Sequence, residues 1–478
     1  MNSFPQELFH CVVDFFRDDR LSLATVRLVT RAWNVSATPH LFRSLDLLIS
    51  EPPPSFHSSP RSSHKSTLKY TGPHKFQALL ALLESSNDIS RCVRQVSLGR
   101  TTIISSSDPE VHARQNTYAL LISSILSHFT YLSDIILREM NWTYLHPSFL
   151  SCILESCRKP SLERIEIWNC QMPTTASLLD FLGASKNVKS LRLSYFKILA
   201  SDDVDVDDTR FPPSAPVGQD GSTRHLSESE PCTSLLQNLA IDAAPDAFVL
   251  HNIFRMRPYS KRFLQLRRLY LANVVDTTDL AEFLHKTGHS LEFLDLRLIA
   301  SMLSIFSNLN SVFIHLFLDN LVQPRLSSIN IDLSHCPRLQ DLRISGLQWT
   351  PSVCPSEYLS SLFTKTSGLS LPIERLQLII TVIKPKSMTP VGFPCVDSQS
   401  DSDLLSPLPP PMRSRATELQ YSDWTILDHI LSSHTFRALQ SLQISLNTIR
   451  HREVDPSRLS AMFPKVQDKA IQVTCTHY

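Results

Sequence analysis

Two histidines in this sequence have the spacing of a zinc site, but the residues around them do not complete one. His285 and His289 are four residues apart, as two zinc ligands on one helix are, yet Gly288 interrupts that helix and no Glu follows His285. The chain has only nine glycines. They form no glycine-rich loop that could hold a phosphate and no Gly-x-Ser-x-Gly turn that could present a nucleophilic serine. These patterns predict no catalytic residue and a protein that is not an enzyme.

Two further groups of polar residues have simpler explanations than a metal site. Asp203, Asp205 and Asp207 have the alternate spacing that opens a calcium-binding loop, but the turn glycine and the closing glutamate are missing. This stretch therefore predicts a solvated acidic loop. Cys152 and Cys157 lie at helical spacing and are expected to pack in a core. We expect no metal and no cofactor.

The composition is that of an ordinary globular chain. The 478 residues carry a formal net charge of +1, which argues against general binding to nucleic acid or to a membrane surface. The ten cysteines include no Cys-x-x-Cys pair, which favours reduced thiols over a disulfide framework. The first residues lack the basic region and apolar run of a secretory signal. We therefore expect a cytoplasmic or nuclear protein with no nucleic-acid partner and no membrane partner.

From residue 76 onward, one arrangement of apolar residues recurs. An amphipathic helix is followed, after a short polar gap, by a strand of the form apolar-x-x-apolar-x-apolar, with about 25 to 35 residues from one copy to the next. The first helices are expected at residues 76–83, 118–129, 149–155 and 176–182. The expected strands begin at Val93, Leu132, Leu162, Val188, Leu236, Leu266, Leu291, Leu326, Leu339, Ile373 and Leu439, with a final strand at residues 470–473.

This alternation predicts an α/β fold in which strand–helix units stack into an irregular leucine-rich-repeat solenoid. A doubly wound sheet could use the same alternation, but the short strands and the absence of a glycine-rich strand-to-helix turn favour the solenoid. The repeat's usual Asn or Cys after each strand is present as Cys170 and Asn447, whereas Phe196 stands at that position in another unit. We therefore expect irregular turns.

The sequence predicts three parts. Residues 1–48 form a small helical motif, residues 49–75 form a flexible linker rich in Pro, Ser and His, and residues 76–478 form the solenoid. Two stretches rich in polar residues and proline, at about 201–231 and 384–415, are expected to be disordered insertions between repeats.

Polar residues between the apolar positions of the expected strands could form a binding surface, because strand side chains alternate between the two faces of a sheet. Arginine, tryptophan and tyrosine often dominate binding energy at protein interfaces. We predict that five such residues on the concave face bind a target protein: Trp168, Arg192, Arg268, Tyr270 and Arg297. The same face carries further arginines and interleaved acids, namely Arg138, Arg164, Arg343, Arg375, Asp134, Glu166, Asp295 and Asp341. The acids indicate a protein partner of mixed charge rather than nucleic acid. Cross-strand ion pairing on an ordinary wet sheet is an alternative that the sequence leaves open.

The first 48 residues carry apolar residues at helical spacing. We expect one helix through Leu8 and Val12, a second over residues 21–33, and a short third helix that starts at Pro39. Three short helices bury too small a fraction of their apolar surface to be stable alone. Another polypeptide, or the rest of this chain, must therefore cover the exposed face.

Two segments of this helical motif resemble the F-box, which binds the Skp-type adaptor of cullin-based ubiquitin ligases. The Leu-Pro-x-Glu-Leu of that family corresponds to Phe4-Pro5-Gln6-Glu7-Leu8, and its Val-Cys-x-x-Trp corresponds to Val29-Thr30-Arg31-Ala32-Trp33. With the repeats, the chain resembles the F-box proteins with degenerate leucine-rich repeats of mushroom-forming fungi.

The resemblance implies a substrate-receptor subunit of an SCF-type ubiquitin ligase, which takes part in ubiquitin-dependent degradation. Its partners would be a Skp-type adaptor, the cullin scaffold and an unknown target protein. By this resemblance, the adaptor-binding residues would be Pro5, Leu8, Val12, Val29 and Trp33. The alternative is a protein–protein interaction scaffold whose first helices serve only to cap the solenoid.

Overall fold

The computed structural model describes residues 6–48, 73–99, 109–145, 147–200, 236–242, 263–274, 278–298, 331–349, 355–364, 370–382, 424–448, 457, 460–469 and 471–477. Pro5, both expected insertions and the expected linker up to residue 72 lie outside these residues. The chain divides into two compact units, Met1–Tyr270 and Leu271–Tyr478. Each is a mixed α/β unit built on parallel strands, which confirms the α/β class.

The first unit contains the strands β1 (Ser44–Leu48), β2 (Gln95–Gly99), β3 (Asp134–Arg138), β4 (Arg164–Trp168), β6 (Ser190–Ser194) and β8 (Asn238–Asp242), followed by the start of β9 (Arg268–Val274). A separate parallel pair is formed by β5 (Gln171–Thr174) and β7 (Lys197–Ala200). Its helices are α1 (Gln6–Phe15), α2 (Arg20–Val26), α3 (Arg31–Phe42), α4 (Pro73–Ser85), α5 (Asn87–Cys92), α6 (Pro109–Ser127), α7 (Pro147–Cys157) and α8 (Thr175–Ala184), with a 3-10 turn η1 (Trp142–Tyr144).

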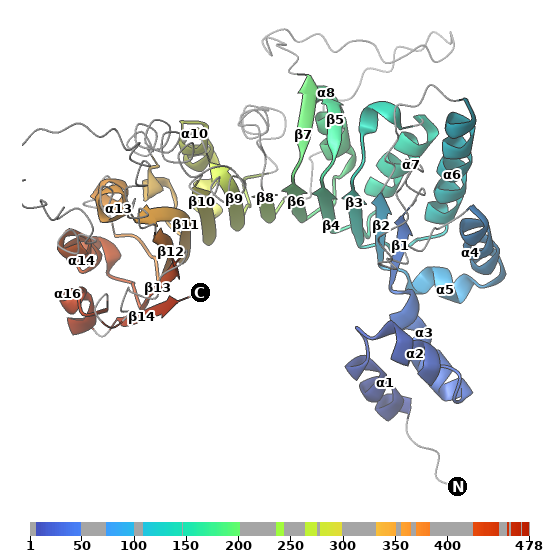
Figure 1. Cartoon of the computed structure of the whole chain (residues 1–478), viewed down its shortest axis with the longest axis horizontal. Coiled ribbons are helices and arrows are strands. Elements are labelled where there is room, and N and C mark those ends of the chain that lie inside the picture. Colours follow the sequence, from blue (N-terminus) through green and yellow to red (C-terminus); the bar gives the residue numbers. More distant parts are fainter. Residues whose placement is uncertain are drawn as a thin grey trace, which may run out of the picture. The chain divides into compact units, whose positions relative to one another are not determined.

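The strands of the first unit lie in the order in which they occur along the chain, and neighbouring strands from β1 to β8 pair in parallel. A doubly wound sheet would reverse its strand order at a switch point, and no reversal occurs between β1 and β8. Neighbouring helices α4, α6, α7 and α8 pack side by side in the same sequence, and α6 and α7 can be followed along the sheet in Figure 1.

The apolar positions of successive strands are in register. One buried row runs through Leu47, Leu98, Leu137, Ile167, Leu193 and Ile241. The alternation of apolar and polar residues sets this register, because a slip of one residue would turn every apolar side chain to the other face. The sequence pattern thus predicted the inward face of each strand correctly.

A repeated backbone contact precedes each strand. One carbonyl accepts hydrogen bonds from two successive N–H groups of the next strand–helix repeat. The Arg94 carbonyl accepts from Ser133 and Asp134, and the Ser133 carbonyl accepts from Glu163 and Arg164. The carbonyls of Arg43, Glu163, Lys189 and Gln237 do the same for the units that follow them. Successive strand–helix repeats of the first unit therefore share one main-chain geometry.

The turns after β3, β4 and β6 are more regular than we expected. The first residue of each turn has a left-handed φ, which is 53° at Glu139, 51° at Asn169 and 52° at Tyr195. The next residue is buried in every case, and these residues are Met140, Cys170 and Phe196. The expectation of an irregular turn at Phe196 was wrong, because its aromatic ring fills the interior without a side-chain hydrogen bond being needed to shape the turn.

The helical start of the chain differs from the expected boundaries. The predicted helix over residues 21–33 is two elements: α2 ends at Val26, and α3 begins at Arg31 and continues through Pro39. The reason is local, because the Thr30 hydroxyl accepts a hydrogen bond from the N–H of Trp33 (3.4 Å) and so caps a new helix. Asp19 caps α2 in the same manner.

A small core joins the three helices. Val13, Leu23 and Ala37 are fully buried, and their apolar neighbours Phe16, Val26, Trp33 and Leu41 pack around them. The motif is attached to the sheet, since β1 follows α3 directly and pairs with β2. The guanidinium of Arg20 also donates to the Ser44 carbonyl (2.6 Å).

The second unit contains β10 (Phe293–Leu298), β11 (Asp341–Trp349), β12 (Arg375–Val382), β13 (Ser441–Thr448) and β14 (Gln472–His477), again in chain order and parallel. The helices and turns are α10 (Thr278–Thr287), η3 (Gly288–Ser290), η5 (Leu333–His335), α13 (Pro355–Thr364), α14 (Trp424–Leu431), η7 (His434–Phe436) and α16 (Pro464–Asp468). The final strand starts two residues later than expected and runs to His477. A bulge in β11 lies between Ile344 and Leu347.

Candidate protein-binding surfaces

An apolar stripe lies on the outer side of α1. Leu8, Val12 and Phe15 recur at positions i, i+4 and i+7, so they share one helix face. Their exposed fractions are 44%, 41% and 87%. The exposed Cys11 lies between them. These four residues are called the α1 stripe below.

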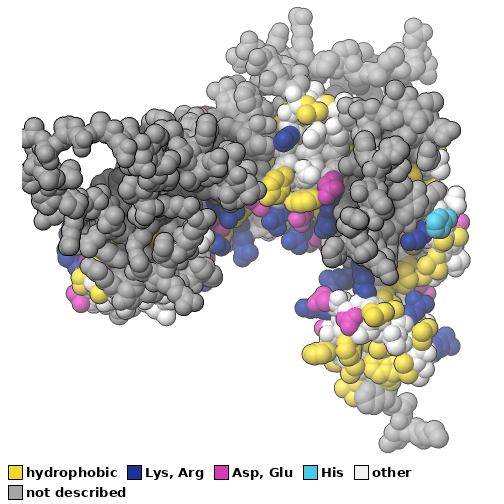
Figure 2. Space-filling view, in the orientation of Figure 1, with side chains coloured by type: hydrophobic (Ala, Val, Ile, Leu, Met, Phe, Trp, Pro, Cys, Tyr) yellow, Lys and Arg dark blue, Asp and Glu magenta, His cyan; other side chains and the backbone are white. Residues whose placement is uncertain are grey.

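Further large apolar side chains are exposed on the same helical motif. They are Leu21 on α2, Leu28 and Val29 between α2 and α3, and Val35 on α3. Figure 2 shows hydrophobic side chains gathered over these helices. Single exposed apolar residues are common on proteins, but a group of this kind on one small motif is typical of an interaction surface.

The predicted adaptor residues fall into two groups in this motif. Leu8, Val12 and Val29 are exposed. Trp33 is half-buried and packs edge to face against Phe9, with the ring centroids 4.7 Å apart. Pro5 lies outside the described residues. The structure therefore brings Leu8 and Val12 together on one face and places Trp33 in the packing beneath.

Sequence reasoning missed several members of this surface. Phe15 continues the helical spacing of Leu8 and Val12 and belongs to the same apolar pattern, but it was not among the predicted adaptor-binding residues. Leu21 and Leu28 gave no comparable signal, since the apolar pattern continues across the break between α2 and α3. The break between α2 and α3 must be known before Leu21 and Leu28 can be assigned to the surface.

The polar face of the first unit carries cross-strand ion pairs. Register places Asp134 beside Arg164 and Glu166 beside Arg192. The charged atoms of both pairs are 4.0 Å apart, and Arg192 also reaches Asp242 at 3.4 Å. The predicted target residue Arg192 is thus held by acids of the sheet itself, as the ion-pairing alternative expects. Such half-exposed pairs contribute little to stability, about 0 to 1 kcal/mol each.

The second unit uses the same arrangement. Arg375 makes a bidentate contact with its register partner Asp341. Arg343 lies 3.5 Å from its register partner Asp295, which is buried. In each case the acid precedes the arginine by one strand.

The other predicted target residues do not take part in these cross-strand ion pairs. Trp168 is 36% exposed at the end of β4, and its ring meets that of Tyr195 edge to face with centroids 6.2 Å apart. Arg268 is exposed at the start of β9, and Tyr270 is half-buried two residues later. Arg297 is exposed on β10 of the second unit. Tyr195 was missed from the sequence because it lies just beyond its strand, in the left-handed turn.

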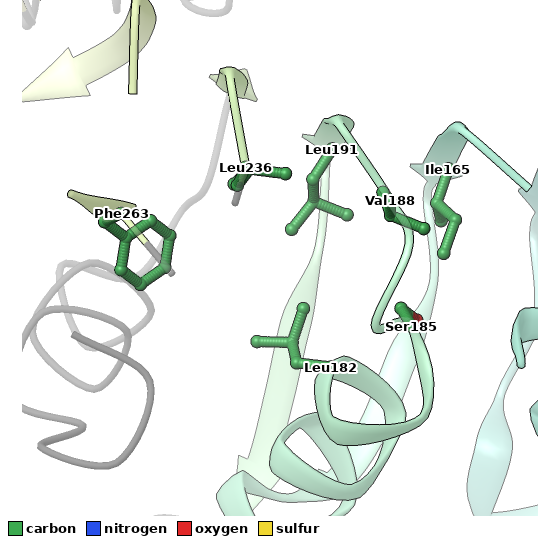
Figure 3. Close-up of a pocket in the computed structure, with 7 residues that line it drawn as sticks. All are labelled: Ile165, Leu182, Ser185, Val188, Leu191, Leu236 and Phe263. Atoms are coloured by element: carbon green, nitrogen blue, oxygen red, sulfur yellow. The ribbon is translucent and has the colours of Figure 1, made fainter. Parts of the chain in front are cut away.

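An apolar pocket in the first unit offers no reactive group. It is small and is lined by Ile165, Leu182, Ser185, Val188, Leu191, Leu236 and Phe263 (Figure 3). Its one hydroxyl, that of Ser185, donates to the Phe181 carbonyl at 2.7 Å. Acid–base or nucleophilic chemistry has no candidate residue in this pocket.

His285 contacts His335 and not His289, its partner in the zinc-like spacing. Nδ1 of His285 lies 3.2 Å from Nε2 of His335, and Asp332 lies 3.6 Å from the same nitrogen. His289 lies instead in the turn η3. Within the described parts of the chain, no three metal-binding side chains form a site that could hold an ion.

Three cysteines of the described structure are buried, and their thiols are expected to be unreactive. Burial raises the pKa of Cys157, Cys170 and Cys336 to about 12, so their thiols stay protonated near neutral pH. No helix in the described ranges has both the length and the apolar character needed to cross a membrane.

No model of a known protein family matches this chain, and no curated protein matches it. Function is therefore inferred from the α1 stripe and from the polar face of the sheet.

Proposed function

We propose that this protein is a substrate-receptor subunit of an SCF-type ubiquitin ligase. Its helical motif binds a Skp-type adaptor, which connects it to the cullin scaffold, and its repeat region binds a target protein. The observation that carries the proposal is the α1 stripe: Leu8, Val12 and Phe15 are exposed on one face of a helix in the motif that resembles an F-box.

The stripe suits a helix that packs into a partner's groove. Apolar anchors at i, i+4 and i+7 are the usual signature of that recognition mode. The motif has its own small core around Val13, Leu23 and Ala37, so the stripe is not needed to hold the three helices together. A role as a simple cap predicts that these side chains pack against the chain's own sheet. Their exposure favours a second polypeptide as the covering partner.

The repeat region supports the target-binding half of the proposal. Parallel strands in chain order, aligned apolar rows and one repeated main-chain contact are what a leucine-rich-repeat solenoid would have. Such a solenoid presents one long polar strand face. In the first unit, Trp168, Arg268 and Tyr270 would belong to that face, and Arg192 would contribute through its ion pairs, whereas Arg297 would belong to the strand face of the second unit.

In this proposal the protein performs no bond-making step. It would hold a target close to the charged conjugating enzyme, so that lysines of the target experience a high effective concentration of activated ubiquitin. This contribution requires two separate binding surfaces and no reactive side chain.

Substitution of the stripe tests the proposal more cleanly than deletion. Deleting residues 1–48 would also remove β1 and expose the edge of β2. The variant Leu8→Ser, Val12→Ser, Phe15→Ser should lose binding of a purified Skp-type adaptor in isothermal titration calorimetry while its circular dichroism is unchanged. The control Leu120→Ser alters another exposed leucine, on α6, and should bind normally. The proposal fails if the wild-type chain does not bind the adaptor, or if the triple variant binds it equally well.

A further inference from the structure

We infer that Arg138, Trp168 and Tyr195 bind an acidic, extended segment of the target protein. These three residues are called the aromatic edge below. The inference rests on the proposed function and names the chemistry of the target that the repeat region would capture.

The aromatic edge is a row of neighbouring strand ends. Arg138 and Trp168 are register partners and are the last residues of β3 and β4. Ser194 is the next residue in this row, and Tyr195 follows it directly. Trp168 and Tyr195 meet edge to face and keep 36% and 52% of their surfaces exposed. Two exposed aromatic rings beside a cation form a surface on which an aliphatic or proline side chain can pack next to a carboxylate.

The turn after β6 leaves the ring of Tyr195 at the surface. Its φ of 52° lies in the left-handed region, which disfavours side chains other than Gly, Asn and Asp. The equivalent turn after β4 uses Asn169, which tolerates this conformation well. The N–H of Tyr195 donates to the Asp242 carbonyl at 2.9 Å, which holds the turn in place. The turn after β3 places Glu139 in the same conformation, so the left-handed φ belongs to the repeated turn, and this turn keeps the Tyr195 ring 52% exposed beside Trp168.

The charges of this face indicate an acidic partner. Arg164 and Arg192 are already paired with Asp134, Glu166 and Asp242. Those acids are the carboxylates that β3, β4 and β8 contribute to this face, and Glu139, which follows Arg138 at the turn position equivalent to Tyr195, is half-buried and has an interaction of its own. Arg138 is exposed, and no described carboxylate forms an ion pair with it.

The same charges argue for a peptide rather than a nucleic acid. The neighbouring acids would repel a continuous polyanion. A peptide can place one carboxylate at Arg138 and apolar side chains on the rings. Strand ends are about 4.8 Å apart, so the row from Arg138 to Ser194 spans about 10 Å, which is the length of three extended residues.

Peptide selection tests this inference on the full chain. The probes are a pool of fluorescent 12-residue peptides built from Asp, Glu, Pro, Leu, Val and Ser, and a matched pool with Lys and Arg in place of the acids. The acidic pool should yield peptides that bind the wild-type chain in fluorescence anisotropy. The variants Arg138→Ala, Trp168→Ala and Tyr195→Asn should each weaken these peptides at least tenfold. Tyr195→Asn is suitable because Asn keeps the left-handed turn.

A matched control separates the aromatic edge from general basic charge. Arg164→Ala removes an exposed arginine of the neighbouring strand that is already paired with Asp134, and it should change affinity less than threefold. The inference is wrong if the two pools bind equally or if neither binds. It is also wrong if Arg138→Ala binds like wild type, if Arg164→Ala weakens binding as strongly as Arg138→Ala, or if a poly-dT oligonucleotide binds more tightly than the peptides.

Adaptor binding measured on the same samples keeps the two proposals apart. The triple variant Leu8→Ser, Val12→Ser, Phe15→Ser should still bind the acidic peptides and should no longer bind the adaptor. Loss of peptide selectivity with intact adaptor binding overturns only this inference. Failure of the wild-type chain to bind the adaptor, with peptide selectivity intact, overturns the proposed function.

Discussion

Phe9 and Trp33 meet edge to face with ring centroids 4.7 Å apart, and this contact determines which sides of α1 and α3 remain available to a partner. Phe9 faces α3, so its neighbour Leu8 and the later residues Val12 and Phe15 turn outward. Folding and docking thus use different side chains of one short helix. Substitutions can therefore separate the two roles.

We expect Leu8→Ala to weaken adaptor binding by about 2 kcal/mol, roughly 30-fold, because it truncates a central anchor of an interface. Its free energy of unfolding should change by less than about 0.5 kcal/mol, since Leu8 is on the surface. Trp33→Ala should instead lower the free energy of unfolding by about 3 kcal/mol, because it opens the packing around Phe9. Calorimetry with the adaptor and urea titration measure the two quantities. Leu120→Ala is the control for an exposed leucine elsewhere. Equal effects of Leu8→Ala and Leu120→Ala on adaptor affinity would contradict the assignment.

Cys11 provides a chemical probe of the α1 stripe. It is exposed, whereas burial raises the pKa of Cys157, Cys170 and Cys336 to about 12. At pH 8, iodoacetamide should therefore modify Cys11 within minutes and leave those three cysteines unmodified in the folded chain. Bound adaptor should slow the modification of Cys11 at least tenfold, as peptide mapping by mass spectrometry can measure. Unchanged labelling of Cys11 in a complex shown to be intact would place the adaptor elsewhere.

Thr30 explains the break between α2 and α3. Its hydroxyl accepts the hydrogen bond from the N–H of Trp33 that starts α3. Thr30→Ala should cost about 1 kcal/mol of helix stability, and Thr30→Ser should restore most of it because Ser is also a good capping residue. Hydrogen exchange of the peptides that cover α3 measures the difference. Equal exchange in the Ala and Ser variants would show that the hydroxyl is not the cap.

The cap of α2 should depend on pH. The hydroxyl of Ser22 and its backbone N–H donate to Asp19, with a further bond from the N–H of Leu21, and they lower the pKa of Asp19 below 3.8. The carboxylate is therefore a better acceptor in the folded chain than in the unfolded one. Its contribution is complete above pH 3.8 and is lost as the pH falls through the lowered folded value. Hydrogen exchange of α2, corrected for the intrinsic rate, should rise in that range. Asp19→Asn keeps an acceptor without the charge, so an equally large rise in that variant would rule out this cause.

Sequence alone predicted the described strands of the main sheet because their apolar residues alternate, but it missed β5 and β7, and the strand expected to begin at Leu326 starts outside the described residues. The apolar positions from Leu47 to Ile241 could be read directly, whereas their parallel register is given by the structure. The boundaries of α2 and α3 were not predictable from spacing, since the apolar period continues past Thr30. The pairing of Arg192 with Glu166 and Asp242 also required the register and side-chain conformations. Tyr195 was missed for a separate reason, because a left-handed turn leaves no trace in the pattern of apolar residues.

Gly346 should be the least replaceable residue of the β11 bulge. Its φ is 78°, and a Cβ atom placed there would lie 2.3 Å from the Leu298 carbonyl oxygen of the neighbouring strand. Gly346→Ala must therefore adopt a disfavoured φ and also push β10 and β11 apart, which should cost about 1–3 kcal/mol. Urea titration of the second unit's unfolding, followed by hydrogen exchange of β10 and β11, measures this loss. Gly183→Ala is the matched control, because Gly183 lies in helix α8 without a positive φ, where alanine is the better helix former. If both variants unfold at the same urea concentration as wild type, the bulge does not require glycine.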